Sequence, residues 1–128
     1  MITISKPQVE VEKAVKDLIS TEEERCTIVH CRHRVLMEAY VRIWKSTYLV
    51  EENGRRCKLI KAFNISIMPD WTFFPGDNRD IRFTLLFEGL SKDCSKFYLK
   101  EEIPEPGGFY SDTVLRNTTD VYEVDIES

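Results

Sequence analysis

The chain has 128 residues, of which 42% are hydrophobic and 31% charged, a composition that predicts one globular domain over residues 1–128 and excludes a disordered or fibrous protein. The formal net charge of −4 argues against a nucleic-acid partner, because nucleic-acid binding requires a concentrated basic face. No apolar run reaches the length of about 18 residues that a membrane span needs, so the sequence predicts none.

The segment Met1–Val15 has neither the basic start nor the apolar stretch of a secretory signal. We therefore expect a soluble protein that is cytoplasmic, or extracytoplasmic if a leader was removed. The cysteines show no Cys-x-x-Cys spacing and leave the compartment open, and we expect most of them to be small buried apolar residues. They are Cys26, Cys31, Cys57 and Cys94.

The first third of the chain contains one clear strand pattern and one ambiguous stretch. Val9, Val11 and Val15 recur at even spacing, which indicates a half-buried strand. Thr21–Tyr40 fits a helix, because Ser20 with a glutamate three residues later forms a capping box. It also fits a strand over Arg25–Val35, which is rich in β-branched residues. We favour the strand, and the helix stays the alternative.

The strongest local signal is Asn53-Gly54, which predicts a two-residue type I′ turn inside a hairpin over Tyr40–Phe63. This turn would place oppositely charged residues across from each other at the tip and apolar residues below them. The predicted pairs are Glu52 with Arg55, Glu51 with Arg56, Val50 with Cys57 and Tyr48 with Leu59.

The second half of the chain contains further short strand patterns. Ile81–Glu88 has the clearest alternation, with Ile81, Phe83, Leu85 and Phe87 on one dry face. Lys96–Lys100, Phe109–Arg116 and Val121–Ile126 follow. Seven or eight short strands, separated by turn signals, predict an antiparallel β-sandwich or barrel.

A cluster of potential metal ligands lies at Cys26, His30, Cys31 and His33. Thiolate and imidazole are the usual zinc ligands. On a helix, Cys26, His30 and His33 would share one face, whereas on a strand side chains alternate and His30 and His33 point to opposite sides. Because the strand is favoured, we predict no metal site. We also predict no catalytic residue and no cofactor, since neither a nucleophile motif nor a phosphate-binding loop is present.

Aromatic residues give the best ligand-binding hypothesis. Trp71, Phe73 and Phe74 cluster in a proline-flanked segment. In an expected strand, Trp44 lies on the same side as Tyr40 and Arg42, because residues two positions apart share a face. An exposed aromatic surface can stack on a sugar or hold a protein partner. The competing interpretation is that these rings plug one end of the sandwich.

Several sequence segments resemble those of small bacterial immunoglobulin-like β-sandwich domains, which occur as accessory domains beside thioredoxin-like proteins. The segments are Val41-Arg42-Ile43-Trp44, Tyr48-Leu49, Asn53-Gly54, and Phe83 to Lys92 followed by Phe97. The similarity extends over Val9–Arg116. It implies a single antiparallel immunoglobulin-like sandwich with a non-catalytic role, and it implies no ligand.

From these patterns we expect an all-β, non-catalytic binding or assembly module whose partner is a protein or a carbohydrate. The predicted ligand-binding residues are Trp44, Trp71, Phe73 and Phe74. The alternative is a small metal-binding protein or enzyme that uses Cys26, His30 and His33. An edge strand at Val121–Ile126 could also pair with a second copy of the chain.

Overall fold

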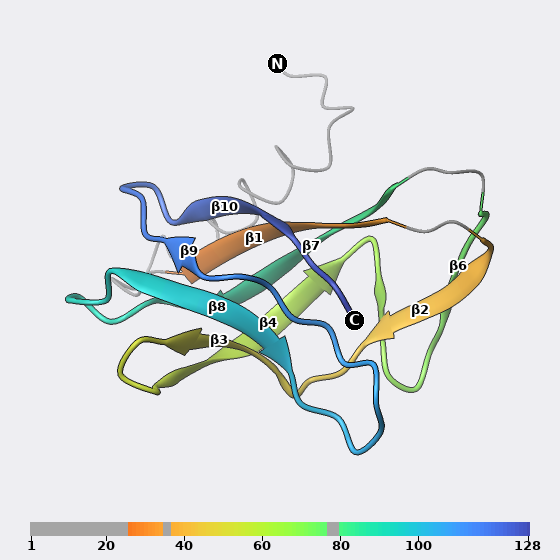
Figure 1. Ribbon diagram of the computed structural model, residues 1–128, viewed down its shortest axis with the longest axis horizontal. Helices are drawn as coiled ribbons and strands as arrows, with labels where there is room; N and C mark the ends of the chain where they lie inside the picture. The colour runs from red at the N-terminus through yellow and green to blue at the C-terminus, as the bar shows by residue number, and fades with distance from the viewer. Residues whose placement is uncertain (1–25, 35–36, 77–79) are drawn as a thin grey trace.

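The computed structural model describes residues 26–34, 37–76 and 80–128 (Figure 1). The strand predicted around Val9–Val15 and the capping box at Ser20 lie outside these residues. Within the described residues every regular element is a strand, which confirms the all-β prediction. The strand interpretation of the ambiguous stretch is confirmed as well, because Cys26–Arg34 is extended. No helix that could cross a membrane is found among them.

The described residues form ten strands in two sheets. The strands are β1 (Cys26–Arg34), β2 (Ala39–Ile43), β3 (Thr47–Glu51), β4 (Arg56–Phe63), β5 (Ser66–Ile67), β6 (Thr72–Phe74), β7 (Asp80–Glu88), β8 (Lys96–Glu101), β9 (Val114–Leu115) and β10 (Val121–Asp125). Seven of them form a large sheet in the order β10-β1-β7-β4-β3-β8-β9, and β5-β2-β6 form a small one.

The sheets mix parallel and antiparallel pairs, so the prediction of a purely antiparallel sandwich is wrong. β10 runs parallel to β1, and β5 runs parallel to β2. The physical reason is that the pair joins the first and last described strands, β1 and β10, which no hairpin connects, so no tight turn forces them to be antiparallel. Local alternation within each strand carries no information about that direction.

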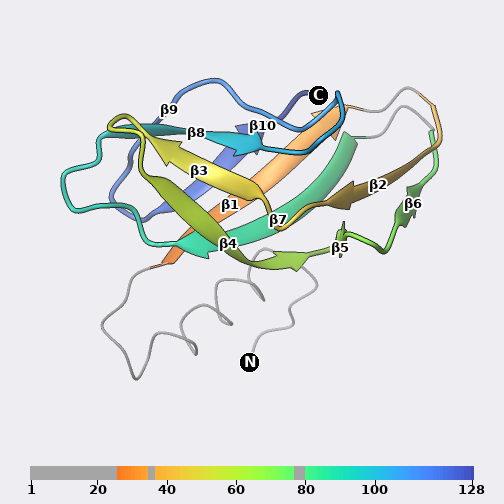
Figure 2. The same cartoon turned by 90° about the horizontal axis from the view of Figure 1, so that it is seen from below.

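The large sheet curls into a nearly closed barrel (Figure 2). Its two ends meet through Tyr110, which bridges Lys100 at the end of β8 and Glu127 just after β10. The Tyr110 amide donates to the Glu127 carbonyl at 2.8 Å, and the Glu127 amide donates to the Tyr110 carbonyl at 2.9 Å. This exchange satisfies backbone groups that an open sheet edge would leave unpaired.

The interior of the barrel is filled by the alternating residues that the sequence predicts. Ile81, Phe83, Leu85 and Phe87 of β7 are buried, as are Phe97 and Leu99 of β8 and Tyr122, Val124 and Ile126 at β10. The opposite side of β7 is also covered, because Thr84 and Leu86 are buried too. The middle of β7 is therefore buried on both faces, whereas the sequence predicts one dry face. Within the predicted strand Phe109–Arg116, only Val114–Leu115 forms a named strand.

The hairpin between β3 and β4 exists, but its predicted register is wrong by one residue. Val50 pairs with Arg56, Leu49 with Cys57 and Tyr48 with Lys58. The Gly54 amide donates to the Glu51 carbonyl at 2.8 Å, and the Glu51 amide donates to the Arg55 carbonyl at 2.8 Å. With Gly54 at a φ of +89°, this is a three-residue loop built on a turn that ends in a left-handed glycine. The shift places Glu51 opposite Arg55.

A Gly54→Ala variant should test this loop, because φ of +89° is strained for any residue with a Cβ. No atom lies within 4 Å of the added Cβ, so the effect comes from backbone conformation alone. We expect a loss of about 1 kcal/mol in the free energy of unfolding, measured by urea denaturation. A Gly54→Asn variant should lose less, since asparagine tolerates this conformation. Equal losses in the two variants would contradict the assignment.

The small sheet extends from one end of the barrel as an arm, at the right of Figure 1. β2 leaves the barrel and is flanked by β5 and β6, with Tyr40 opposite Phe73 and Arg42 opposite Ser66. The inward residues Ala39, Val41 and Phe74 pack against the main core. The outward residues of the arm are therefore placed by strand alternation on a surface of their own.

Candidate binding surface

The outward face of the arm carries an unusual set of large side chains, which we call the aromatic surface. It consists of Tyr40, Arg42, Trp44, Trp71 and Phe73. Tyr40 is 67% exposed, Trp71 54% and Phe73 49%. Exposed aromatic groups this large and this close together are uncommon on a surface that contacts only water.

Ring contacts hold the aromatic surface together. The Arg42 guanidinium carbon lies 3.8 Å from the centre of the Trp71 ring and 5.5 Å from that of Trp44, so the cation is placed between two indoles. The rings of Tyr40 and Phe73 have centres 5.2 Å apart at an angle of 57°. The Arg42 Nη1 group also donates to the Pro69 carbonyl at 3.3 Å. Cation–π contacts of this kind stabilise by roughly 0.5–1 kcal/mol each at exposed sites, and they restrict ring motion.

A groove of about 550 Å³ lies along this surface. One wall contains Tyr40, Trp44 and Trp71 from the arm, and the other contains Ile103 and Glu105 from the connection after β8. Arg34 and Glu38 also line it. Ligand pockets in proteins have similar volumes and a similar mixture of aromatic and polar groups.

Glu101 joins the two walls at the base of the groove. Its buried carboxylate accepts hydrogen bonds from the Trp44 amide at 2.9 Å and from the Thr47 hydroxyl at 3.2 Å. Its other oxygen accepts from the Phe109 amide at 3.2 Å. Because these donors come from both sides of the groove, the carboxylate fixes the spacing of the walls.

The four aromatic residues predicted from the sequence fall into two groups. Trp44, Trp71 and Phe73 lie on the aromatic surface, with Tyr40 and Arg42 beside them. Phe74 lies on the opposite face of β6, where it packs against the core. The sequence-based site does not include the groove wall that contains Ile103 and Glu105. The Pro/Gly-rich composition of this connection does not indicate that it lies next to the arm.

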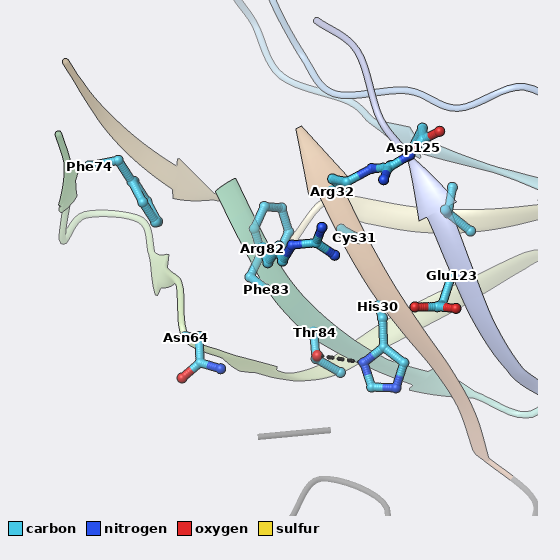
Figure 3. Close-up of a pocket in the computed structure, with 11 residues that line it drawn as sticks. His30, Cys31, Arg32, Asn64, Phe74, Arg82, Phe83, Thr84, Glu123 and Asp125 are labelled. Atoms are coloured by element: carbon cyan, nitrogen blue, oxygen red, sulfur yellow. Dashed lines mark hydrogen bonds and ion pairs between the residues drawn. The ribbon is translucent and has the colours of Figure 1, made fainter. Parts of the chain in front are cut away.

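A second cavity, of about 540 Å³, lies where β1, β7 and β10 run side by side (Figure 3). His30 Nδ1 and the Thr84 hydroxyl are 2.7 Å apart, and Arg32 Nε donates to Asp125 at 2.6 Å. Arg82 and Glu123 complete its charged lining. Arg32 faces the opposite charge of Asp125 on β10 but the like charge of Arg82 on β7, and Asp80 lies within 4.0 Å of both guanidinium groups.

The residues of the metal hypothesis do not converge. Cys26 and His30 point to the outer face of β1, while His33 points the other way and contacts Phe109 and the Ile126 carbonyl. Among the described residues no group of three His, Cys, Asp or Glu side chains could hold a metal ion. This follows directly from strand geometry, which separates residues of odd and even spacing.

The buried thiols are not poised for nucleophilic chemistry. Burial raises the pKa of Cys57 to about 12, despite the nearby Arg55 guanidinium, which lowers it. Burial likewise raises the pKa of Cys31 and, with a contribution from Glu51, that of Cys94. These three thiols therefore remain protonated near neutral pH, whereas a cysteine nucleophile must be a thiolate.

Comparisons with protein-family models, curated proteins and solved structures give no match to this chain. The functional interpretation therefore rests on the geometry of the aromatic surface and its groove.

Proposed function

We propose that the protein is a non-catalytic binding module that holds its ligand at the aromatic surface. The observation that carries this proposal is the exposure of Tyr40, Trp71 and Phe73 as one contiguous group on an arm outside the barrel. Tryptophan, tyrosine and arginine are the residues that contribute most to binding energy at protein surfaces. The aromatic surface combines all three.

Preorganisation supports the same proposal. Arg42 is placed between Trp44 and Trp71, and Glu101 fixes the main chain at Trp44. Side chains that are already ordered lose less entropy when a ligand binds, so more of the contact energy appears as affinity. A structural plug would bury its rings, whereas Tyr40, Trp71 and Phe73 are each about half exposed or more.

The alternative function, a metalloprotein or enzyme that uses Cys26, His30 and His33, has less support because these side chains do not share a face. The relation to immunoglobulin-like accessory domains, suggested by Phe83–Lys92, stays a prediction. Pairing of two copies through Val121–Ile126 also stays a prediction. That segment lies at one end of the large sheet, but Glu127 next to it already pairs with Tyr110.

The neighbouring residues Phe73 and Phe74 provide a matched test of the proposal. Phe73→Ala should change the free energy of unfolding by at most about 1 kcal/mol, because its ring is half exposed on the aromatic surface. Phe74→Ala should cost more, about 1–2 kcal/mol, because its ring is partly buried against the core. Urea denaturation of both variants measures the difference. A larger loss for Phe73→Ala would show that the aromatic surface serves the fold rather than a ligand.

A further inference from the structure

We propose that the ligand of the groove is a short, neutral oligosaccharide. This inference rests on the proposed function and specifies the chemical class of the ligand. Three independent features of the groove support it: its shape, the pairing of its charges and the position of its exposed rings.

The shape favours a small ligand over a broad protein interface. The groove has two walls, formed by the arm and by the connection that contains Ile103 and Glu105, with the buried Glu101 between them. Concave sites of this size enclose small molecules, whereas protein interfaces are wider. A chain of sugar units fits such a two-walled site because it is narrow and amphipathic.

The charges favour a ligand without net charge. Arg34 and Arg42 line the groove together with Glu38 and Glu105, so cations and anions are both present. A polyanion would meet the glutamates, and a polycation would meet the arginines, each at an unfavourable electrostatic energy. Hydroxyl groups both donate and accept hydrogen bonds, and they can therefore satisfy guanidinium donors and carboxylate acceptors in the same site.

The aromatic rings supply the apolar contact that sugars need. Tyr40 and Trp71 line the groove and are more than half exposed. Rings that combine a broad apolar body with a polar tip suit a ligand that presents C–H faces between hydroxyl groups. The Arg42 guanidinium, 3.8 Å from the Trp71 ring centre, keeps that indole in place.

An extended peptide is a less suitable occupant. A peptide strand would add beside β5 or β6, the two edge strands of the small sheet. No residue of either strand lines the groove, whereas Tyr40 and Trp71 do. Strand addition would therefore leave the groove empty.

Intrinsic tryptophan fluorescence can follow ligand binding, because the two tryptophans of the chain, Trp44 and Trp71, both line the groove. We propose to screen the full chain against an array of neutral and acidic oligosaccharides, and then to titrate hits while following tryptophan fluorescence and heat. At least one neutral oligosaccharide should bind more tightly than its acidic counterparts. Tyr40→Ala and Trp71→Ala should each weaken binding at least about tenfold, the factor that corresponds to 1.4 kcal/mol.

Tyr98→Ala is the matched control, because Tyr98 is an exposed tyrosine on β8 that does not line the groove. This variant should bind as the original chain does, and circular dichroism should show all variants folded. Preference for acidic oligosaccharides, or neutral binding unchanged in both Tyr40→Ala and Trp71→Ala, would overturn the inference.

A display library of random peptides, screened in parallel, separates the two levels of the proposal. If no sugar binds but peptides bind in a manner that Trp71→Ala abolishes, the oligosaccharide inference is wrong and the proposed binding surface stands. If neither probe binds in a manner that depends on Trp71, both the inference and the proposed function are wrong.

Discussion

A Leu86→Ala variant should lose about 2–5 kcal/mol of unfolding free energy, the usual cost of truncating a fully buried leucine. Leu86 is 0% exposed although it points away from the barrel interior. It packs with Ile28 in a second apolar cluster, against which Phe63 and Val121 also lie. The truncation would therefore remove apolar contacts and leave a cavity outside the barrel. Urea denaturation measures the loss.

Ile60→Ala is the control for this prediction, since Ile60 on β4 is 50% exposed. It should change the unfolding free energy by about 0.5 kcal/mol or less, the range of ordinary surface substitutions. If Leu86→Ala lost as little unfolding free energy as Ile60→Ala, the outer face of β7 would be accessible to water. The second apolar cluster would then not contribute to stability.

Glu51→Ala should be the second strongly destabilising variant, at about 2–3 kcal/mol. The carboxylate is 2% exposed, and its Oε2 atom accepts from Arg55 at 2.6 Å and from the Ser91 amide and hydroxyl at 2.9 and 3.1 Å. The Cys57 thiol donates to the same oxygen at 3.4 Å. Removing the acceptor takes away the charge partner of Arg55, which keeps its bond to the Gly89 carbonyl, and it removes the acceptor of the Ser91 amide. We place the cost below that of a fully buried ion pair because Arg55 is partly exposed to water.

The same carboxylate should make stability depend on pH. Burial alone would raise the pKa of Glu51, but the hydrogen bonds from Ser91, Arg55 and Cys57 outweigh it and lower the pKa. A lowered pKa in the folded state means that the stabilisation is present above the unfolded-state pKa and is lost as the pH falls through the folded-state value.

Urea midpoints measured between about pH 7 and about pH 3 should therefore fall more steeply for the original chain than for Glu51→Gln, in which the titrating group is absent. Glu51→Gln keeps the shape of the side chain and so separates the ionisation from packing. Parallel midpoint curves for the two proteins would contradict the role assigned to this carboxylate.

The strand content of the described residues was readable from the sequence wherever one face of a strand is apolar. β7, β8 and β10 all follow the two-residue alternation of Ile81–Glu88, Lys96–Lys100 and Val121–Ile126. Such alternation reports burial, which is a local property. It contains no information about which strands become neighbours, and the parallel pair of β1 with β10 and the barrel closure through Tyr110 were therefore not predicted.

In the hairpin between β3 and β4, the local sequence signal identified the turn but did not determine the loop length or the register. Asn53-Gly54 identifies the turn, yet it fits both a two-residue loop and a three-residue loop that ends in a left-handed glycine. The charge pairs at the tip did not distinguish the two registers, because Arg55 and Arg56 can each face a glutamate. In the observed register the buried Glu51 also accepts hydrogen bonds from Ser91, a contact that the local sequence does not reveal.

The candidate site was partly predictable for a related reason. Alternation placed Trp44 with Tyr40 and Arg42, and the exposed Trp71 and Phe73 were identified by composition. Phe74 lies on the other face of β6, because consecutive strand residues point to opposite faces. The second wall, at Ile103 and Glu105, depends on tertiary placement of a connection and leaves no trace in the local sequence.

The pairing of β1 with β10 has a consequence for biosynthesis. Arg32 and Asp125 are joined across 93 positions, and the Ile126 amide binds the Arg32 carbonyl at 2.9 Å. Until the residues from Val121 onward are synthesised, the edge of β1 that pairs with β10 has no partner strand. Contacts between such distant positions form slowly, so the nascent polypeptide can complete its barrel only after Glu127 has emerged from the exit tunnel.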